Sequence, residues 1–419
     1  MNKPLCMSAA LFLCLGTIAA GAADNWPSWR GPAFNGVCDA VNVPTAWSAT
    51  DNVAWKLPLP GPSGSTPAVW DERIFVTTTG EGKNLILCID RSGKILWQKA
   101  VGDERKGKHD RKGSGAHPSP TTDGTHVFVY YRSGDLACLD FQGNLVWHKN
   151  LQQLYGPDTL WWDMGTSPVL TKDHVVVAVI HDKPAFLIAF DKKTGTLAWK
   201  QDRSLDAPRE ANQSYTTPIV YSEGDRQTLF ILGADHITAH DAADGKEIWR
   251  VGGLNPDDQG FFRCIASPVV SDGILVAPYA RGKTLTAVRL GGSGDITKTH
   301  LEWFRDDLSA DIPSLAAKDG RLYLLADRGQ FACMDIKTGK TLWSGELANR
   351  KATFSASPVL VDGKIYLTSD SGTTFVLQQG DEFKLMATNE LGEFTLATPV
   401  FTRNQILIKT YKNIFCIGK

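Results

Sequence analysis

The stretch CMDIKTGKTLW, residues 333–343, predicts the fold of this chain because its pattern recurs. In each copy an Asp ends an apolar strand, a turn containing Gly follows, and a Trp closes the pattern. Copies of similar length end at Trp97, Trp147, Trp199 and Trp249, and a longer copy ends at Trp303. Self-similarity with a period of roughly 40–50 residues is typical of propellers and solenoids.

A second pattern, Ser-Pro or Thr-Pro before an apolar run, alternates with the first. It occurs at Pro67, Pro120, Pro168, Pro218, Pro268, Pro358 and Pro399, with a degenerate copy at Pro313. Pro is tolerated at the first residue of a strand, where its missing N–H does least harm. Between two such prolines the chain contains four short apolar runs, for example TSPVLT, HVVVAVI, AFLIAFD and TLAWK. Four antiparallel strands per repeat are typical of a propeller blade.

The two ends of the chain each supply part of one blade. The last repeat contains only three strands, ATPVFT, QILIKT and NIFCIG, whereas NVAWKLPL around Trp55 has no neighbouring strand to pair with. Pairing these segments would close the ring and remove its exposed edges. We therefore predict an all-β, eight-bladed β-propeller with four antiparallel strands per blade, closed by an N-terminal strand. Met386 is expected to take the Trp position in the seventh blade.

The first 49 residues precede the repeats. Lys3, the apolar residues 7–20 and the small residues that follow are typical of a signal peptide over residues 1–23. This apolar stretch is too short for a stable transmembrane segment. Cys6 and Cys14 each follow a Leu, which disfavours a lipid anchor. We expect an exported protein, periplasmic or extracellular, with an N-terminal extension at 24–49 that packs on a propeller at 50–419.

The charge and the cysteines exclude some classes of function. The chain has 44 basic and 45 acidic residues, which provides no basic surface for nucleic acid or an anionic membrane. Equivalent positions in separate blades lie too far apart for disulfides. We therefore interpret the cysteines at these positions as small buried hydrophobic residues. They are Cys88, Cys138, Cys333 and Cys416.

The repeated Trp residues are predicted to be structural. A Trp on an outermost strand can bury its ring between blades and donate its indole N–H to a neighbouring carbonyl. The Gly of each turn permits a positive φ. An aromatic binding box is the alternative, but one Trp per blade around the whole ring favours docking. The predicted docking residues are Trp55, Trp97, Trp147, Trp199, Trp249, Trp303 and Trp343.

The pattern A-x-D-x-x-T-G-x-x-x-W, with Ala or Cys first, resembles the tryptophan-docking repeat of the pyrroloquinoline-quinone (PQQ) propeller superfamily. The resemblance covers nearly all of the chain after residue 23. NWPSWRGPAFNGV, LPGPSGSTP and ATNELGEFTLATP are similar to stretches in the short exported branch of this superfamily. That branch includes the outer-membrane assembly factor BamB and PQQ-like repeat proteins of planctomycete type.

The resemblance implies two classes of function. Quinoprotein dehydrogenases hold PQQ against an adjacent Cys-Cys disulfide and bind Ca²⁺ with Glu, Asn and Asp, but this sequence has no Cys-Cys pair. Other catalytic motifs are also absent from it. We therefore expect a non-catalytic, monomeric scaffold without a cofactor or metal, holding a protein, peptide or envelope component at one face. The alternative is an oxidoreductase with PQQ and calcium, or another small ligand, in the central channel.

The connections between blades differ in length, and this predicts where a partner binds. The connections that end at Pro120, Pro168, Pro218 and Pro268 are longer than the other four. Because binding concentrates on long loops of a rigid scaffold, we expect an off-centre site at the channel mouth. The alternative is that the aromatic side chains fold down as plugs over neighbouring blades. The predicted binding residues are His117, Trp161, Trp162, Asp163, Asn212, Tyr215, Arg263, Asp311 and Glu393.

Overall fold

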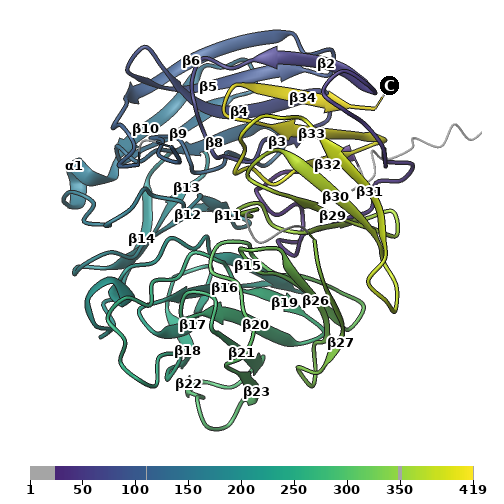
Figure 1. Ribbon diagram of the computed structural model, residues 1–419. Helices are drawn as coiled ribbons and strands as arrows, with labels where there is room; N and C mark the ends of the chain where they lie inside the picture. The colour runs from purple at the N-terminus through teal and green to yellow at the C-terminus, as the bar shows by residue number, and fades with distance from the viewer. Residues whose placement is uncertain (1–23, 110, 348–351, 419) are drawn as a thin grey trace, which may run out of the picture.

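The computed structural model describes residues 24–109, 111–347 and 352–418, and the predicted signal peptide at 1–23 lies outside these residues. The chain forms eight separate sheets of four or five strands, arranged around a central axis (Figure 1). This arrangement confirms the eight-bladed all-β propeller. None of the helices in the described residues is long and apolar enough to span a membrane.

The first four blades follow one another along the chain. Blade 1 contains β3 (Ala68–Trp70), β4 (Arg73–Gly80), β5 (Lys83–Asp90) and β6 (Ile95–Asp103). Blade 2 contains β7 (Thr121–Thr122), β8 (His126–Tyr130), β9 (Asp135–Asp140) and β10 (Leu145–Asn150). Blade 3 contains β11 (Val169–Leu170), β12 (His174–Val179), β13 (Phe186–Asp191) and β14 (Leu197–Asp202). Blade 4 contains β15 (Ile219–Glu223), β16 (Arg226–Gly233), β17 (His236–Asp241) and β18 (Glu247–Val251), and the short β22 (Gly294–Asp295) pairs with its outer edge.

The remaining four blades complete the circle. Blade 5 contains β19 (Val269–Ser271), β20 (Ile274–Tyr279), β21 (Thr284–Arg289) and β23 (Leu301–Arg305). Blade 6 contains β24 (Ala316–Lys318), β25 (Arg321–Leu325), β26 (Gln330–Asp335) and β27 (Thr341–Glu346). Blade 7 contains β28 (Val359–Val361), β29 (Lys364–Thr368), β30 (Thr373–Gln378) and β31 (Leu385–Glu390). Blade 8 contains β32 (Val400–Thr402), β33 (Gln405–Lys409), β34 (Asn413–Ile417) and β2 (Val53–Pro58).

Blade 8 joins the two ends of the chain, as predicted. Strand β2 pairs antiparallel with β34, with Trp55 opposite Cys416 and Lys56 opposite Phe415. Figure 1 shows the purple β2 beside the yellow β34. The pairing closes the ring of blades, so neither terminal segment leaves an unpaired sheet edge there.

The core lies between the blades. The middle strands β4 and β5 are buried along nearly their whole length, whereas the outermost β2 alternates between half-buried and exposed residues. Buried side chains of neighbouring blades share hydrophobic clusters, and one cluster contains Phe75 of blade 1 and Val127 of blade 2. Both faces of each blade meet another blade, so apolar residues and Thr alike are buried in the middle strands.

The cysteines of the repeat lie opposite the outermost Trp of their own blade. Cys88 is opposite Trp97 and Cys333 is opposite Trp343, while Ala takes this place in blades 3, 4 and 5. A small residue leaves room for the indole ring, which explains the choice between Cys and Ala. The six cysteines in the described residues are buried and free.

The indole rings of the outermost strands reach the next blade. Five of them donate Nε1–H to a backbone carbonyl at 2.8–3.0 Å: Trp55 to Arg91, Trp97 to Phe141, Trp147 to Lys192, Trp303 to Ile336 and Trp343 to Gly380. The turn Gly beneath a ring has no space for a side chain, since a Cβ at Gly195 would lie 2.6 Å from Trp147 Cγ. This Gly also has a φ of +66°. The turn therefore requires Gly for both its conformation and its contact.

Blade 7 departs from the predicted pattern. The register places Ala387 opposite Val376, where the other blades have Trp opposite a small residue. Met386 falls at the irregularity in the strand pairing and is exposed, like Leu342 in blade 6. The prediction that Met386 takes the Trp position was therefore wrong by one residue, because the bulge before the Trp is invisible in the sequence.

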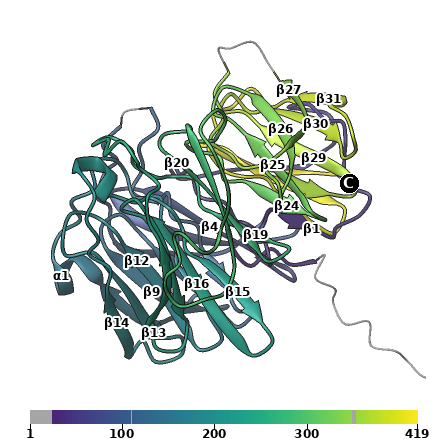
Figure 2. The same ribbon diagram turned by 90° about the horizontal axis from the view of Figure 1, so that it is seen from below.

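The segment before β2 packs along the propeller. The fully buried Trp26 forms a bridge with Val69 of blade 1, and β1 (Val37–Cys38) pairs in parallel with β28. Figure 2 shows β1 beside β24 of blade 6. Ser48 then bridges to Glu390 before the chain enters β2. The helices are short and lie in connections: α1 (Leu151–Tyr155) after blade 2 and the 3₁₀ helix η2 (Arg209–Asn212) after blade 3.

Candidate functional site: a cavity inside a ring of hydroxyl groups

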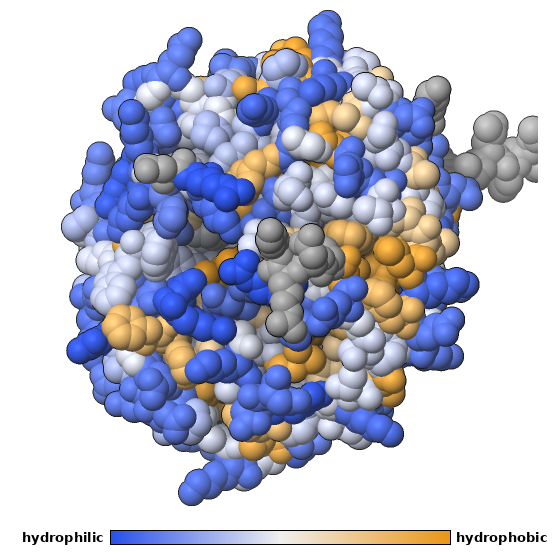
Figure 3. All heavy atoms as spheres, viewed as in Figure 1, coloured by the Kyte–Doolittle hydropathy of each residue, from blue (hydrophilic) through white to orange (hydrophobic). Residues whose placement is uncertain are grey.

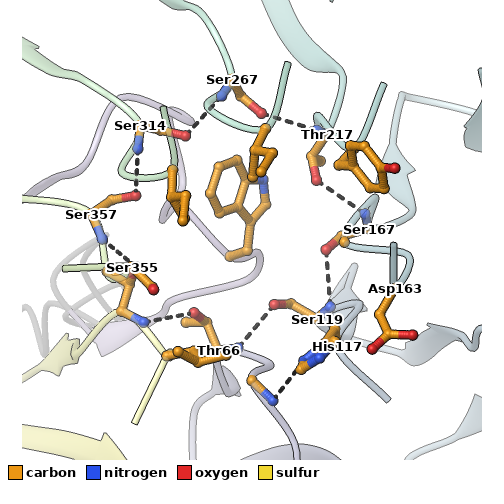
Figure 4. Close-up of a pocket in the computed structure, with 18 of the residues that line it drawn as sticks. Thr66, His117, Ser119, Asp163, Ser167, Thr217, Ser267, Ser314, Ser355 and Ser357 are labelled. Atoms are coloured by element: carbon orange, nitrogen blue, oxygen red, sulfur yellow. Dashed lines mark hydrogen bonds between the residues drawn. The ribbon is translucent and has the colours of Figure 1, made fainter. Parts of the chain in front are cut away.

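Eight side-chain hydroxyl groups, one from each blade, encircle the propeller axis (Figure 4). The backbone N–H of each residue donates to the hydroxyl oxygen of the next, at 2.9–3.2 Å, until Thr398 donates to Thr66 and closes the circle. We call this set the hydroxyl ring. It consists of Thr66, Ser119, Ser167, Thr217, Ser267, Ser314, Ser357 and Thr398.

The hydroxyl ring explains the Ser-Pro and Thr-Pro dipeptides. Seven members of the ring directly precede the Pro that opens an innermost strand, and Ser314 directly follows Pro313. A residue before Pro is restricted to extended conformations, which suits a backbone that must present its N–H to the neighbouring blade. The sequence pattern showed the Pro at a strand start, but the reason for the hydroxyl appears only when the ring is closed.

A cavity of about 440 Å³ lies at this ring, and all eight ring residues line it. Such a volume falls within the range of small-molecule sites. The cavity also has apolar walls formed by Ile265, Ile312 and Leu396. Its remaining lining includes aromatic and charged side chains from the N-terminal segment and from the connections between blades.

The N-terminal segment lies at one end of the cavity, where Trp29 joins the lining. The carbonyl of Pro27 accepts from Thr122 N–H, and that of Gly36 accepts from Leu360 N–H. Both partners lie on innermost strands beyond the hydroxyl ring. The segment therefore runs from blade 2 to blade 7, at the end of the channel away from the connections that enter these strands.

Arg30 fastens this segment. Its guanidinium is buried and donates to the carbonyl oxygens of Pro358, at 3.0 Å, and Leu315. Burial lowers the pKa of Arg30 to about 9. A single side chain thus binds the segment to blades 6 and 7.

Trp162 dominates the other end of the cavity, which we call the mouth. Its ring stacks on His109, with 5.3 Å between ring centroids, and the Arg263 guanidinium carbon lies 5.8 Å from the Trp162 ring centroid. Its Nε1–H donates to Glu210 Oε1 at 2.7 Å. These contacts orient the ring, yet Trp162 remains 41% exposed.

A chain of ion pairs supports Trp162 from below. Glu210 is 1% exposed and lies 2.8 Å from Arg281 and 3.8 Å from Arg263. Arg263 also lies 3.3 Å from Asp311. Removing one member would leave a buried charge without its partner, which is strongly unfavourable.

Asp311 and Asp327 form a second layer, and both are half-buried. The backbone N–H groups of Asp311 and Ile312 donate to Asp327 Oδ1 at 3.2 and 3.1 Å. Burial, together with the nearby charge of Asp311, raises the pKa of Asp327 to about 6. Burial also raises the pKa of Asp311, although Arg263 opposes the shift. Asp327 therefore keeps its proton to a higher pH than an ordinary aspartate does.

The side of the cavity near blade 1 carries His117 and Asp163. His117 Nδ1 accepts from Gly64 N–H at 3.1 Å, and burial lowers the pKa of His117 to about 4, so the imidazole is neutral near pH 7. Asp163 pairs with Arg132 at 3.1 Å and accepts from Lys108 N–H at 2.8 Å. Figure 4 shows His117 and Asp163 beside the hydroxyl ring.

The predicted binding residues fall into two groups. His117, Trp162, Asp163, Tyr215 and Arg263 line the cavity. Four others are absent from its lining among the described residues: Trp161, Asn212, Asp311 and Glu393.

Those four residues lie outside the described cavity lining and have other neighbours. Trp161 is 46% exposed and lies beside Phe261, with 6.2 Å between ring centroids. Asn212 ends η2, and Asp311 stands behind Arg263. Glu393 accepts from Asn413 at 2.8 Å and pairs with Lys56, within blade 8.

The large apolar residues of the long connections divide between the two expected roles. Tyr215 and Leu160 are buried, as plugs would be. Trp161, Trp162 and Phe261 remain exposed. On the face shown in Figure 3, charged and polar residues predominate and apolar patches lie between them.

The sequence reasoning missed Trp29, His109, Lys112 and the hydroxyl ring. Trp29 belongs to the extension, which was expected only to pack on the propeller. Lys112 lies in a charged stretch without periodicity and pairs with Asp370, on a distant connection, at 2.8 Å. Only the repetition of Ser or Thr at each strand start could have indicated the ring.

The residues present do not fit the calcium site that the quinoprotein resemblance implied. The described residues contain no group of three or more His, Cys, Asp and Glu side chains able to hold a metal ion. Asp163 is the one carboxylate among the described residues of the cavity lining, and Arg132 already pairs with it. Four of the buried free cysteines lie in blade strands, whereas Cys38 lies on β1 and Cys264 on the connection before β19.

The eight blades, their repeated turns and an axial cavity define a PQQ-like β-propeller. The family described as outer membrane protein assembly factor BamB matches residues 82–250 and 233–385. The chain belongs to this family.

Individual relatives are distant. The outer membrane protein assembly factor BamB of Moranella endobia (strain PCIT) is 24% identical over 357 residues, which is 83% of each chain. The crystal structure of BamB from Moraxella catarrhalis is similar with a TM-score of 0.61 at 17% identity, over 87% of this chain and 99% of the other. The quinohemoprotein alcohol dehydrogenase from Comamonas testosteroni is similar with a TM-score of 0.69 at 12% identity, over 96% and 82%. The two structural similarities concern the fold alone.

Proposed function

We propose that this protein is an exported, non-catalytic and monomeric scaffold that holds a polypeptide of the cell envelope at the mouth of its cavity. Membership of the BamB family supports the scaffold, because the relatives are named as protein assembly factors. The observation that carries the proposal is the exposure of three large aromatic side chains, Trp161, Trp162 and Phe261, at one sector of the propeller.

These side chains have the properties of interface anchors. Interface hot spots are enriched in Trp and Arg, and they are most effective when neighbouring groups hold them in place. Trp162 is held by Glu210 and lies against Arg263, while Arg209 lies 5.5 Å from the Phe261 ring centroid. A partner would therefore meet aromatic surfaces that are already ordered.

The test is capture of a partner from an envelope extract by the mature protein. We expect the Trp161→Ala and Trp162→Ala variants to lose this partner while they melt near the wild-type temperature. Leu145→Ala is the matched control, because Leu145 is a 59% exposed apolar residue on the outermost strand β10. If the two Trp variants capture the partner as well as the control does, the mouth is not the interface.

The alternative is a small-ligand oxidoreductase with PQQ in the channel. Its support is the cavity volume and the fold shared with a quinohemoprotein alcohol dehydrogenase. The cavity lining argues against the calcium-bound form, since its carboxylate is already paired. Calcium-dependent reduction of an artificial electron acceptor by the PQQ-loaded protein would establish this alternative.

A further inference from the structure

The members of the hydroxyl ring accept hydrogen bonds but do not donate any to the described residues. Each hydroxyl oxygen accepts one backbone N–H, and no described residue accepts the proton of any of the eight. The ring residues are only 1–5% exposed. A buried donor without an acceptor costs free energy, so these protons need an acceptor that enters the cavity.

Two residues that line the cavity carry further donors that no described residue uses. The indole Nε1 of Trp29 and the Nε of Arg263 are buried and have no acceptor in the described part of the chain. The acceptors nearby are already occupied, because Asp163 binds Arg132 and His117 Nδ1 binds Gly64 N–H. The cavity lining therefore carries donors that the described residues leave unused, and a group rich in acceptor atoms would complement them.

A carboxylate best matches this requirement. When ionised it accepts through two oxygens and donates no hydrogen bond. Two cationic side chains also line the cavity, and each already has a carboxylate partner: Lys112 pairs with Asp370 and Arg263 with Asp311. The apolar walls formed by Ile265, Ile312 and Leu396 favour an apolar group beside that carboxylate.

The shape of the cavity limits which part of a polypeptide can bring in a carboxylate. The N-terminal segment crosses one end of the channel at Trp29, so entry is from the mouth. A cavity with one entrance admits the end of a chain more readily than its middle. A carboxyl terminus combines the acceptor group with an adjacent side chain in one residue, and its capture is a recurrent mode of peptide recognition.

We propose that the cavity binds the C-terminal residue of a partner polypeptide. The carboxylate lies among the ring hydroxyls and Trp29 Nε1–H, and an apolar side chain packs on Ile265, Ile312 and Leu396. The residues that precede it pass Trp162 at the mouth. This inference rests on the proposed scaffold function, because it identifies which part of the partner enters the cavity.

The first experiment uses the wild-type mature protein and two probes. One is a hexapeptide that ends in leucine with a free carboxylate, labelled with fluorescein at its N-terminus, and the other is the same peptide with a C-terminal amide. Fluorescence anisotropy should show at least ten-fold weaker binding of the amide. Equal binding of the two peptides, or binding of neither, would overturn the proposal.

The second experiment identifies the source of the carboxylate. 4-Methylpentanoate carries the carboxylate and the apolar group of leucine without a peptide chain. We expect it to displace the labelled peptide only at concentrations at least ten-fold above the dissociation constant of the peptide. Displacement at comparable concentrations would make the cavity a site for a small carboxylic acid and would refute a polypeptide ligand.

A pair of matched variants tests the cavity donors. Trp29→Phe removes the unused indole N–H and keeps an aromatic ring, so the free-acid peptide should bind at least ten-fold more weakly. Trp26→Phe also removes an indole N–H without a partner in the described residues, but Trp26 is absent from the described cavity lining, and binding should change less than two-fold. Equal effects of the two variants would refute a role for Trp29. Melting temperatures show whether each variant is folded.

These outcomes separate the inference from the proposed function. If the partner captured from envelope extract depends on Trp162 but the free-acid and amide peptides bind equally, the mouth remains an interface and C-terminal recognition is wrong. If the free-acid peptide binds selectively and no capture depends on Trp161 or Trp162, the interface at the mouth is wrong.

Discussion

The contact between Gly195 and Trp147 should make the turn of blade 3 intolerant of any side chain. An alanine at a φ of +66° costs about 1–2 kcal/mol. Its Cβ would lie 2.6 Å from Trp147 Cγ, which must then move, and overpacking of this kind costs about 1–3 kcal/mol. Loss of the hydrogen bond from Trp147 to the Lys192 carbonyl adds about 1 kcal/mol. We therefore expect Gly195→Ala to lower the free energy of unfolding by about 3–6 kcal/mol.

Gly363→Ala provides the control. Gly363 has the same φ of +66°, but a Cβ there would meet nothing within 4 Å. This variant should lose only the conformational contribution, about 1–2 kcal/mol. Urea denaturation followed by tryptophan fluorescence and by circular dichroism would measure both losses. Equal destabilisation by the two substitutions would refute the argument that the Trp ring requires glycine beneath it.

A double-mutant cycle isolates the steric contribution. In a Trp147→Ala background the ring is gone, so Gly195→Ala should cost about as much as Gly363→Ala. Two neighbouring residues that conflict in this way should show a coupling energy of at least about 1 kcal/mol. No coupling would mean that the turn of blade 3 and the Trp of blade 2 are energetically independent. The proposal that these Trp residues dock one blade on the next would then be wrong.

Four further predictions follow from the ends of the chain, the mouth and the half-buried carboxylates. Deleting residues 24–58 removes the partner of β34, so the melting temperature should fall sharply, and an unchanged value would contradict closure by β2. Trp162→Ala or Arg263→Ala should weaken binding of the envelope partner by about 2 kcal/mol, and calorimetry with the purified partner would measure this. Given PQQ and Ca²⁺, the purified protein should not reduce an artificial electron acceptor with alcohols or aldose sugars, and calcium-dependent turnover would overturn the scaffold proposal. The pKa of Asp327 is raised to about 6 in the folded state, so ionisation of this carboxyl group destabilises the fold as pH rises from about 4 through 6. The Asp327→Asn variant should therefore have a higher melting temperature than the wild type at pH 8. This difference in melting temperature should shrink below pH 6.

The fold could be predicted because its information is local and repeated. Five blades carry an Asp, a Gly turn and a Trp within about a dozen residues, and these copies predict the same geometry. Closure by β2 could be predicted by counting strands. The two ends of the chain each lack a partner strand, and pairing them with each other removes both exposed edges. The error at Met386 arose where a single copy is degenerate and a strand irregularity shifts the register by one residue.

The cavity was less accessible to sequence reasoning because its residues come from all eight blades. The length of a connection is visible in the sequence, and it directed attention to the sector that contains Trp162 and Arg263. The direction in which a side chain points, unlike the length of a connection, cannot be read from the sequence. Trp161 and Trp162 are adjacent, yet one lies beside Phe261 and the other faces the cavity. Glu393, on the connection into blade 8, accepts a hydrogen bond from Asn413 of that blade instead.

The N-terminal extension connects the closure of the ring to the form of the cavity. Trp29 lines the cavity, Arg30 binds blades 6 and 7, and β2 follows as the last strand of blade 8. The hydroxyl ring likewise depends on closure, because Thr398 of the last repeat donates to Thr66 of the first. Unused donors can converge on one ligand only if all eight blades keep their spacing. The same terminal pairing that removes the sheet edges therefore also determines the geometry of the site, and a partner that binds in the cavity should stabilise the closed ring.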